Sequence, residues 1–193
     1  YARGMTHWHR RNRHCGRCGS PARSRRGGHM RQCADAACAT ELFPRIDPAV
    51  IMLVEQTAPR DGVAKCLLGH SRSVPRRVYS TLAGYVDPGE SLEEAVAREV
   101  MEETGIEIHA AAYCASQPWA FPGCLMIGFR AAAREQAIVL APDELEDARW
   151  FSADEVRAFA EYDAAERGDA PALPRRDSIA RTLVDAWLRE QPA

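Results

Sequence analysis

The sequence predicts an α/β fold: a mixed β-sheet between helices, preceded by a small metal-stapled module. Two observations carry this prediction. From residue 45 onward, short apolar runs typical of buried strands are mixed with a few amphipathic helical segments. Residues 14–44 are instead rich in Gly, Arg and Cys and have no helical period. A chain of 193 residues is long enough for one ordinary domain plus such a module.

The elements of the larger domain each have a local signal. The segment 49–54 is an uninterrupted apolar run, which is typical of a buried strand. Residues 91–104 have apolar side chains at helical spacing, and Gly105 ends that helix. Ser152 followed by Glu155 predicts a capping box at the start of another helix. Strands are predicted at 49–54, 64–69, 80–83, 107–116, 124–132 and 146–151, helices at 91–104, 153–160 and 177–190, and a loop at 165–175.

Charge and hydropathy narrow the classes of function. The formal net charge is -2, from 25 Lys+Arg against 27 Asp+Glu, so the protein as a whole is not a basic, polyanion-binding body. Lys65 is the only lysine, which we interpret mainly as genomic base composition. No apolar run approaches the roughly 20 residues that span a bilayer, and no signal peptide follows the N-terminus. We therefore expect a cytoplasmic protein with no membrane partner.

Residues 1–13 predict a short helix with Met5 and Trp8 on one side. An arginine-rich, acid-free N-terminus also resembles a transit peptide. We favour a linker helix from an upstream domain that is missing here, because the first cysteine motif begins directly after it and the chain starts at Tyr1.

The cysteines of the segment 14–44 have metal-ligand spacing: C-x2-C, a 14-residue gap and then C-x4-C. Thiolates in two such knuckles suit tetrahedral Zn²⁺, and a closed four-sulfur shell is structural rather than catalytic. Disulfides are the alternative, and they are disfavoured because nothing in the sequence indicates export. Cys66 and Cys114 are expected to be small buried residues. The predicted zinc ligands are Cys15, Cys18, Cys33 and Cys38.

Three glutamates of the helix 91–104 share one face. Glu99, Glu102 and Glu103 stand at i, i+3 and i+4, so their carboxylates gather and repel one another. Mg²⁺ or Mn²⁺ relieves such repulsion, because these ions prefer carboxylate oxygen. Arg98 lies one position off this face and can pair with Glu90 in the preceding loop. An acidic, solvated helix without a metal is the alternative.

The stretch from Gly84 to Ile106 fits the pattern G-x5-E-x7-R-E-U-x-E-E-x-G-U, where U is aliphatic. All seven fixed identities and both aliphatic positions are present, so the segment resembles the Nudix signature in full. We expect Gly84 and Gly89 to permit backbone turns. The resemblance implies the Nudix fold and metal-assisted attack of water on a diphosphate. The structural residues of the motif would be Gly84, Glu90, Arg98 and Gly105.

A zinc ribbon followed directly by a Nudix domain resembles the NADH pyrophosphatase (NudC-like) family. Residues 116–124, Ser-Gln-Pro-Trp-Ala-Phe-Pro-Gly-Cys, are similar to that family's S-Q-P-W-P-F-P-x-S motif. Ala120 and Cys124 depart from it, which bears on fine substrate contacts. Trp119 and Phe121 offer flat surfaces for a base, although a packed turn between strands is the alternative. The implied domains are a linker helix at 1–13, a zinc ribbon at 14–44 and a Nudix domain at 45–193.

The resemblance also implies roles for individual residues. Catalytic work would fall to Glu99, Glu102, Glu103 and Glu144, and the catalytic metal would be held by the Ala83 carbonyl, Glu99, Glu103 and Glu144. The substrate would be contacted by Phe43, Tyr85, Gln117, Pro118, Trp119, Ala120, Phe121, Pro122, Gly123, Cys124 and the Ala180 backbone. Phe43 would reach across a homodimer.

The expected function is hydrolysis of NADH or NAD⁺ to nicotinamide mononucleotide and AMP, together with removal of NAD caps from RNA. Arginines between Arg10 and Arg31 could bind RNA phosphates, although we favour the ribbon as a scaffold or dimer contact. A pyrophosphatase for ADP-ribose or another nucleotide is one alternative. A non-catalytic nucleic-acid-binding protein is another, and the intact glutamates argue against it.

Overall fold

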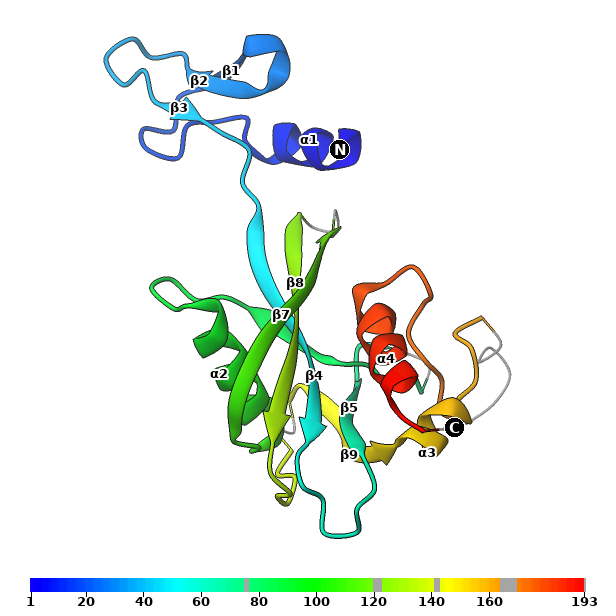
Figure 1. The fold of residues 1–193 in the computed structure, drawn as a ribbon. Coiled ribbons are helices and arrows are strands. Elements are labelled where there is room, and N and C mark those ends of the chain that lie inside the picture. Colours follow the sequence, from blue (N-terminus) through cyan, green and yellow to red (C-terminus); the bar gives the residue numbers. More distant parts are fainter. Residues whose placement is uncertain (75–76, 120–122, 141–142, 164–169, 193) are drawn as a thin grey trace. The chain divides into compact units, whose positions relative to one another are not determined.

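The structure is a computed structural model that describes residues 1–193 apart from 75–76, 120–122, 141–142, 164–169 and 193. The chain forms two compact units (Figure 1). The first unit consists of residues 1–47 and 118–125, and the second consists of residues 48–117 and 126–193.

Among its described residues, the first unit has one α-helix, a short 3-10 helix (Arg26–Gly28) and a three-stranded sheet in the order β1-β2-β3. The β1–β2 hairpin is antiparallel, with Arg23 opposite Gln32. The helix buries Trp8, and the next residue, His9, places its Nε2 2.8 Å from the carbonyl oxygen of Gly28 beside the hairpin. The elements are α1 (Ala2–Arg11), β1 (Ala22–Arg25), β2 (Met30–Cys33) and β3 (Glu41–Leu42).

The second unit is built on a sheet with the strand order β7-β8-β4-β5-β9, and β6 pairs with β4 off this path. The pairs β4–β5, β4–β6 and β5–β9 are antiparallel. Its strands are β4 (Asp47–Gln56), β5 (Lys65–Ser71), β6 (Leu82–Tyr85), β7 (Ile108–Trp119), β8 (Cys124–Ala133) and β9 (Leu145–Ser152), and its helices are α2 (Leu92–Thr104), α3 (Ala153–Arg157) and α4 (Ile179–Glu190).

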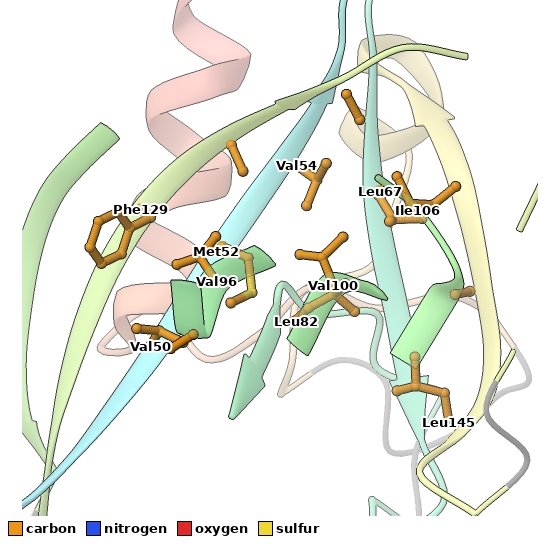
Figure 2. Close-up of a cluster of buried hydrophobic side chains, with 14 residues drawn as sticks. Val50, Met52, Val54, Leu67, Leu82, Val96, Val100, Ile106, Phe129 and Leu145 are labelled. Carbon is orange, nitrogen blue, oxygen red and sulfur yellow. The ribbon is translucent and has the colours of Figure 1, made fainter. Parts of the chain in front are cut away.

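Strand β4 lies inside the second unit with both faces buried, which explains its uninterrupted apolar run. Successive side chains of a strand point to opposite faces. Figure 2 shows Val50, Met52 and Val54 in one buried cluster with Val96 and Val100 of α2. The other cluster, on the side of α4, includes Ile51, Leu53, Leu183, Val184 and Trp187. Helices α2 and α4 therefore cover opposite faces of the sheet (Figure 1).

Most predicted elements are present, with shifted ends. The predicted strand at 80–83 becomes β6 at Leu82–Tyr85, because its backbone pairs with Ala49 to Met52 of β4. The predicted helix at 153–160 is shorter, since Ala160 leaves it to hydrogen-bond Pro171 and bridge Ala172. The capping box of Ser152 and Glu155 is confirmed. Part of the predicted loop at 165–175 lies outside the described residues.

The prediction that Cys114 is buried is wrong. Cys66 on β5 is fully buried, as predicted, whereas Cys114 is exposed on β7, the edge strand of the sheet. An edge strand has a neighbour on one side only, so nothing in the sequence pattern alone forces its small residues inward. Among the described helices, none is long and apolar enough to cross a membrane.

Candidate functional site

The glutamate-bearing helix α2 is fixed at both ends by its own sequence. Ser91 accepts a hydrogen bond from the Glu94 backbone amide at 3.2 Å, and the Glu94 carboxylate accepts one from the Ser91 amide at 2.8 Å. This capping box satisfies two otherwise unpaired amides of the first turn. Gly105 ends the helix in the left-handed conformation, with φ of 68°. The helical register between these caps brings the three predicted carboxylates to one face.

Arg98 organises the acidic residues around this face. Its guanidinium forms a bidentate pair with Glu90, at 2.7 and 2.9 Å, which confirms the predicted ion pair. It also donates to Glu99 at 2.8 Å, to Glu102 at 3.0 Å and to the carbonyl oxygen of Tyr85 at 2.8 Å. The pairing with Arg98 holds the pKa of Glu90 below its usual range. Sequence spacing indicated the first of these contacts and not the others.

Glu103 is the least compensated acid of the group. It is 7 % exposed, and its Oε2 has no hydrogen-bond partner among the described residues. Burial, followed by the charges of Glu99, Glu144 and Glu102, raises the pKa of Glu103 to about 8. Burial also raises the pKa of Glu99, against the pull of Arg98. A divalent cation would supply the missing partner and the missing positive charge, so these residues fit one.

Gly84 is required for a different reason from the predicted one. A Cβ at this position would lie 1.8 Å from the Glu99 carboxyl carbon, so the carboxylate occupies the space of the absent side chain. The expectation that Gly84 serves a backbone turn is therefore wrong. Gly84 lies in strand β6 and does not have a positive φ angle. Gly89 has φ of 94° and fits the predicted turn.

The other two predicted metal ligands, the Ala83 carbonyl and Glu144, come from outside helix α2. Ala83 is on β6, one residue before Gly84, and pairs with Ile51 of β4. Glu144 lies in an exposed turn before β9, and its charge contributes to the raised pKa of Glu103. The carboxylates are near enough to influence one another. Among the described residues, however, only the cysteine sulfurs form a group of ligand atoms that all lie within 4.8 Å of one another.

The sulfur atoms of the four predicted zinc ligands converge, all within 4.8 Å of one another. The Cys15 and Cys38 sulfurs are 3.8 Å apart, and those of Cys18 and Cys33 are 3.4 Å apart. Tetrahedral zinc with Zn–S bonds of about 2.3 Å requires sulfurs about 3.8 Å apart. A disulfide requires about 2.05 Å, and all four cysteines are free thiols here. The geometry favours a metal over the disulfide alternative.

The backbone of the two knuckles prepares these thiols for a cation. Hydrogen bonds from backbone N–H groups of the first knuckle, above all that of Arg17, lower the pKa of the Cys15 thiol. Hydrogen bonds from Thr40 lower the pKa of Cys38 to about 6. Burial raises the pKa of Cys33 to about 12, so this thiol needs a metal to become a thiolate. Zinc ligation requires deprotonated sulfur, and the set as a whole fits that ion.

The predicted substrate-contacting residues are distributed over both units. Phe43 and Trp119 belong to the first unit and are 57 % and 38 % exposed, while Tyr85 in the second unit is 52 % exposed. Exposed aromatic rings have flat faces on which a base can stack. Cys124, at the position where the similar motif has Ser, is buried. Pro118 and Gly123 are described, whereas Ala120, Phe121 and Pro122 lie outside the described residues.

The Gln117 side chain binds the backbone at the start of α4, next to Ala180 in the sequence. The Gln117 side chain donates to the Asp177 carbonyl oxygen at 2.7 Å and accepts from the Ile179 amide at 2.8 Å. Ser178 caps the Arg181 amide at 3.2 Å. The Ala180 amide lies between the Ile179 and Arg181 amides in the sequence. It has no hydrogen-bond partner within the part of the chain that the structure describes. Gln117 thus orients a helix start that presents one free donor.

Comparison with known families matches both units. The family model described as NUDIX domain matches residues 45–175. The model described as NADH pyrophosphatase zinc ribbon domain matches residues 10–43. The first match covers more than half of the chain and includes helix α2 with all three clustered glutamates.

The chain is similar to curated proteins along almost its whole length. It is 44 % identical to the NAD-capped RNA hydrolase NudC of Stutzerimonas stutzeri (strain A1501), over 97 % of this chain and 60 % of that protein. It is 45 % identical to Nudix hydrolase 19, chloroplastic, of Arabidopsis thaliana, over 99 % and 51 % respectively. It is 38 % identical to the human NAD-capped RNA hydrolase NUDT12, over 99 % and 41 %. The chain therefore spans about half the length of the curated relatives it matches.

Solved structures share the fold. A NUDIX hydrolase from Nitrosomonas europaea superposes with a TM-score of 0.58 at 18 % identity, over 85 % of this chain and 99 % of that one. The NUDIX domain of Shewanella oneidensis NrtR, crystallised with ADP ribose, gives a TM-score of 0.57 at 17 % identity, over 77 % and 91 %. At these identities the likeness concerns the fold alone.

Proposed function

Because this chain belongs to the Nudix hydrolase family, we propose that it hydrolyses the pyrophosphate bond of NADH or NAD⁺, and of the NAD cap on RNA. The products would be nicotinamide mononucleotide and AMP, or a 5′-monophosphate RNA. The observation that carries the proposal is the buried, unpartnered carboxylate of Glu103 beside Glu99 and Glu102. Relatives named as NAD-capped RNA hydrolases support the choice of substrate.

The glutamate face would do its work around Mg²⁺ or Mn²⁺. Glu99, Glu103, Glu144 and the Ala83 carbonyl would hold the ion. The bound ion polarises phosphoryl oxygens and makes a bound water more acidic. Arg98 keeps the carboxylates of Glu99 and Glu102 oriented, since it donates to both. The proton of the attacking water would pass to Glu102, Glu103 or Glu144.

Substrate choice would depend on residues outside the glutamate face, because a diphosphate alone does not distinguish NADH from other nucleotides. Trp119 and Tyr85 have exposed rings that suit stacking on a base or nicotinamide. The free amide of Ala180, at the start of α4, is a donor for an anionic or carbonyl oxygen. Phe43 would contribute from the partner chain of a homodimer. The zinc-bound ribbon would serve as the scaffold from which Phe43 extends.

The main alternative is a pyrophosphatase for ADP-ribose or another nucleoside diphosphate derivative, which would use the same glutamates. The test is a comparison of kcat/KM on NADH, NAD⁺, ADP-ribose and NAD-capped RNA, with the products identified. NADH or capped RNA should be the best substrate. ADP-ribose as the best substrate would overturn the proposal.

The variant Trp119→Ala sharpens this comparison. Loss of a stacking surface should lower kcat/KM on NADH. The loss should correspond to about 1–3 kcal/mol of transition-state stabilisation, and to less on a substrate without a base at that position. Tyr113→Ala removes an exposed aromatic ring of the same strand outside the predicted loop, and it should leave all four rates unchanged. Equal losses on all substrates after Trp119→Ala would mean that Trp119 only shapes the fold.

A further inference from the structure

The net charge of -2 conceals two units of opposite charge. The first unit contains ten arginines, no lysine and three acidic residues, which gives a net charge of +7. The second unit contains 15 basic and 24 acidic residues, which gives a net charge of -9. The two values add to the -2 of the whole chain. Acidic residues are therefore scarce in the unit that contains the ribbon.

Base composition explains only part of this pattern. It accounts for arginine in place of lysine, and this preference is the same in both units. It does not account for the scarcity of acids in the first unit. In the second unit, at least eight arginines form salt bridges with carboxylates: Arg60, Arg98, Arg130, Arg149, Arg157, Arg175, Arg176 and Arg181.

Most arginines of the first unit form no salt bridge with a described carboxylate. Arg45 pairs with Asp47, and Arg31 is engaged with His9 and the Ala22 carbonyl oxygen. Six others are exposed and make no side-chain hydrogen bond or ion pair with any described residue: Arg10, Arg11, Arg13, Arg17, Arg23 and Arg26. With Arg25, which donates weakly to Gln32 at 3.4 Å, we call these seven the arginine surface.

The hairpin of the ribbon separates its arginines by face. Arg23 and Arg25 are two residues apart on β1, so their side chains share a face, and Gln32 lies opposite Arg23 on the same face. Arg31 lies opposite Ser24 and points to the other face, where it meets His9 of α1. On the helix side of the hairpin, Arg31 is thus engaged within the unit, while on the outer side neither Arg23 nor Arg25 forms a salt bridge with a described carboxylate.

We propose that the arginine surface binds the phosphodiester backbone of the RNA chain that follows an NAD cap, an inference that rests on the proposed function. Seven like charges within one small unit repel one another, and a polyanion removes that repulsion while releasing its own counterions. Guanidinium groups match phosphate oxygens in a bidentate geometry. Because cap and RNA chain are covalently linked, contacts to the chain add to the binding of the dinucleotide. Free NADH makes no use of this surface.

The test compares two triple variants of the zinc-loaded full chain. Arg13→Gln with Arg23→Gln and Arg25→Gln removes three charges of the arginine surface. Arg72→Gln with Arg134→Gln and Arg189→Gln removes three exposed arginines of the second unit that have no side-chain partner among the described residues. Both variants change the net charge equally. Zinc content is measured for each, so that a damaged ribbon is recognised.

Two measurements are made over a range of salt concentrations. The first is the affinity for a short, single-stranded, uncapped RNA, read by fluorescence anisotropy without any hydrolysis. The second is kcat/KM on NADH and on the same RNA carrying an NAD cap. Each lost phosphate contact should reduce the slope of log affinity against log salt by about 0.7, so the surface triple should lower the slope by about 2.

At low salt the surface triple should weaken RNA affinity and kcat/KM on capped RNA by about 10- to 100-fold, with NADH hydrolysis unchanged. The control triple should leave the salt slope unaltered. Equal losses in both triples, or an unchanged slope in the surface triple, would overturn the inference. If the wild type binds the uncapped RNA through these arginines yet hydrolyses neither NADH nor capped RNA, the proposed function fails and the RNA-binding surface stands.

Discussion

The two candidate metal centres of this chain differ in how completely the protein satisfies their ligands. The four thiols of the ribbon face one another, with sulfur separations of 3.4 and 3.8 Å and hydrogen bonds from their own knuckles. The glutamate face of α2 is open. Glu103 keeps one buried oxygen without a partner, and Glu102 is more than half exposed.

This difference separates a structural role from a chemical one. A closed sulfur shell leaves no coordination position for substrate or water, so its ion can only stabilise the fold. An open oxygen shell leaves room for water and phosphate, which metal-assisted hydrolysis requires. Soft thiolates select zinc, whereas carboxylates suit Mg²⁺ or Mn²⁺. Ions should therefore exchange readily at the second centre and not at the first.

The largest effect is expected at the closed centre. Cys33→Ser, or removal of the ion by a chelator, should unfold the β1–β2–β3 sheet, because zinc binding to such sites contributes about 10–16 kcal/mol. The buried core of the second unit should persist. Elemental analysis should find about one zinc per chain in the wild type and none in the variant. Cys114→Ser changes an exposed cysteine outside the cluster and should retain the zinc. Disulfides among the four ribbon cysteines in freshly reduced protein would contradict the assignment.

At the open centre, Glu103→Gln should lower turnover by about 10³-fold or more while the fold stays intact. The variant keeps the size and helix propensity of the residue and removes one ligand charge. Glu93→Gln makes the same chemical change at an exposed position of the same helix and should have almost no effect. Circular dichroism and steady-state kinetics at saturating Mg²⁺ decide between these outcomes. Near-normal turnover of Glu103→Gln would remove the catalytic assignment.

The close approach of Gly84 to Glu99 predicts a moderate effect on the open centre. Gly84→Ala should lower the free energy of unfolding by about 1–3 kcal/mol, because the added methyl group displaces a buried carboxylate. Metal affinity should fall with it, since Glu99 is a proposed ligand. Gly89→Ala meets no described heavy atom within 4 Å and should cost only about 1 kcal/mol, for its left-handed backbone. If both variants bound Mn²⁺ as the wild type does, the displacement argument would be wrong.

The most gradual effect, spread over several pH units, is the pH dependence of the open centre. The pKa of Glu103 is raised to about 8, so the folded, metal-free protein keeps a proton that the unfolded chain releases above its ordinary value of 4.5. Its stability should therefore fall as the pH rises from about 4.5 to about 8. Metal competes with that proton, so Mn²⁺ affinity should rise by at most about tenfold per pH unit and level off above about pH 8. Titration calorimetry without substrate measures this, and Glu103→Gln should abolish the rise. A flat profile in the wild type would show that Glu103 is ionised without metal.

Local signals in the sequence predicted much of the fold. Capping boxes at Ser91 and Ser152, the helix end at Gly105 and the apolar run of β4 all depend on residues close together in the chain. For this reason they could be predicted from spacing and residue type alone. The two cysteine knuckles and the face shared by the glutamates are similar cases, since helix and turn geometry fix which neighbours converge.

Other features depended on contacts between residues far apart in the sequence. The space that Glu99 takes at Gly84, the exposure of Cys114 on an edge strand and the early end of α3 at the Ala160–Ala172 bridge each require a partner strand or loop. The sequence by itself determined which residues have metal-ligand chemistry and their local spacing. Only the tertiary structure decided which charges are compensated, because salt bridges and burial arise from long-range packing. It leaves Glu103 buried without a hydrogen-bond partner, and six arginines of the ribbon unit exposed without a side-chain partner among the described residues.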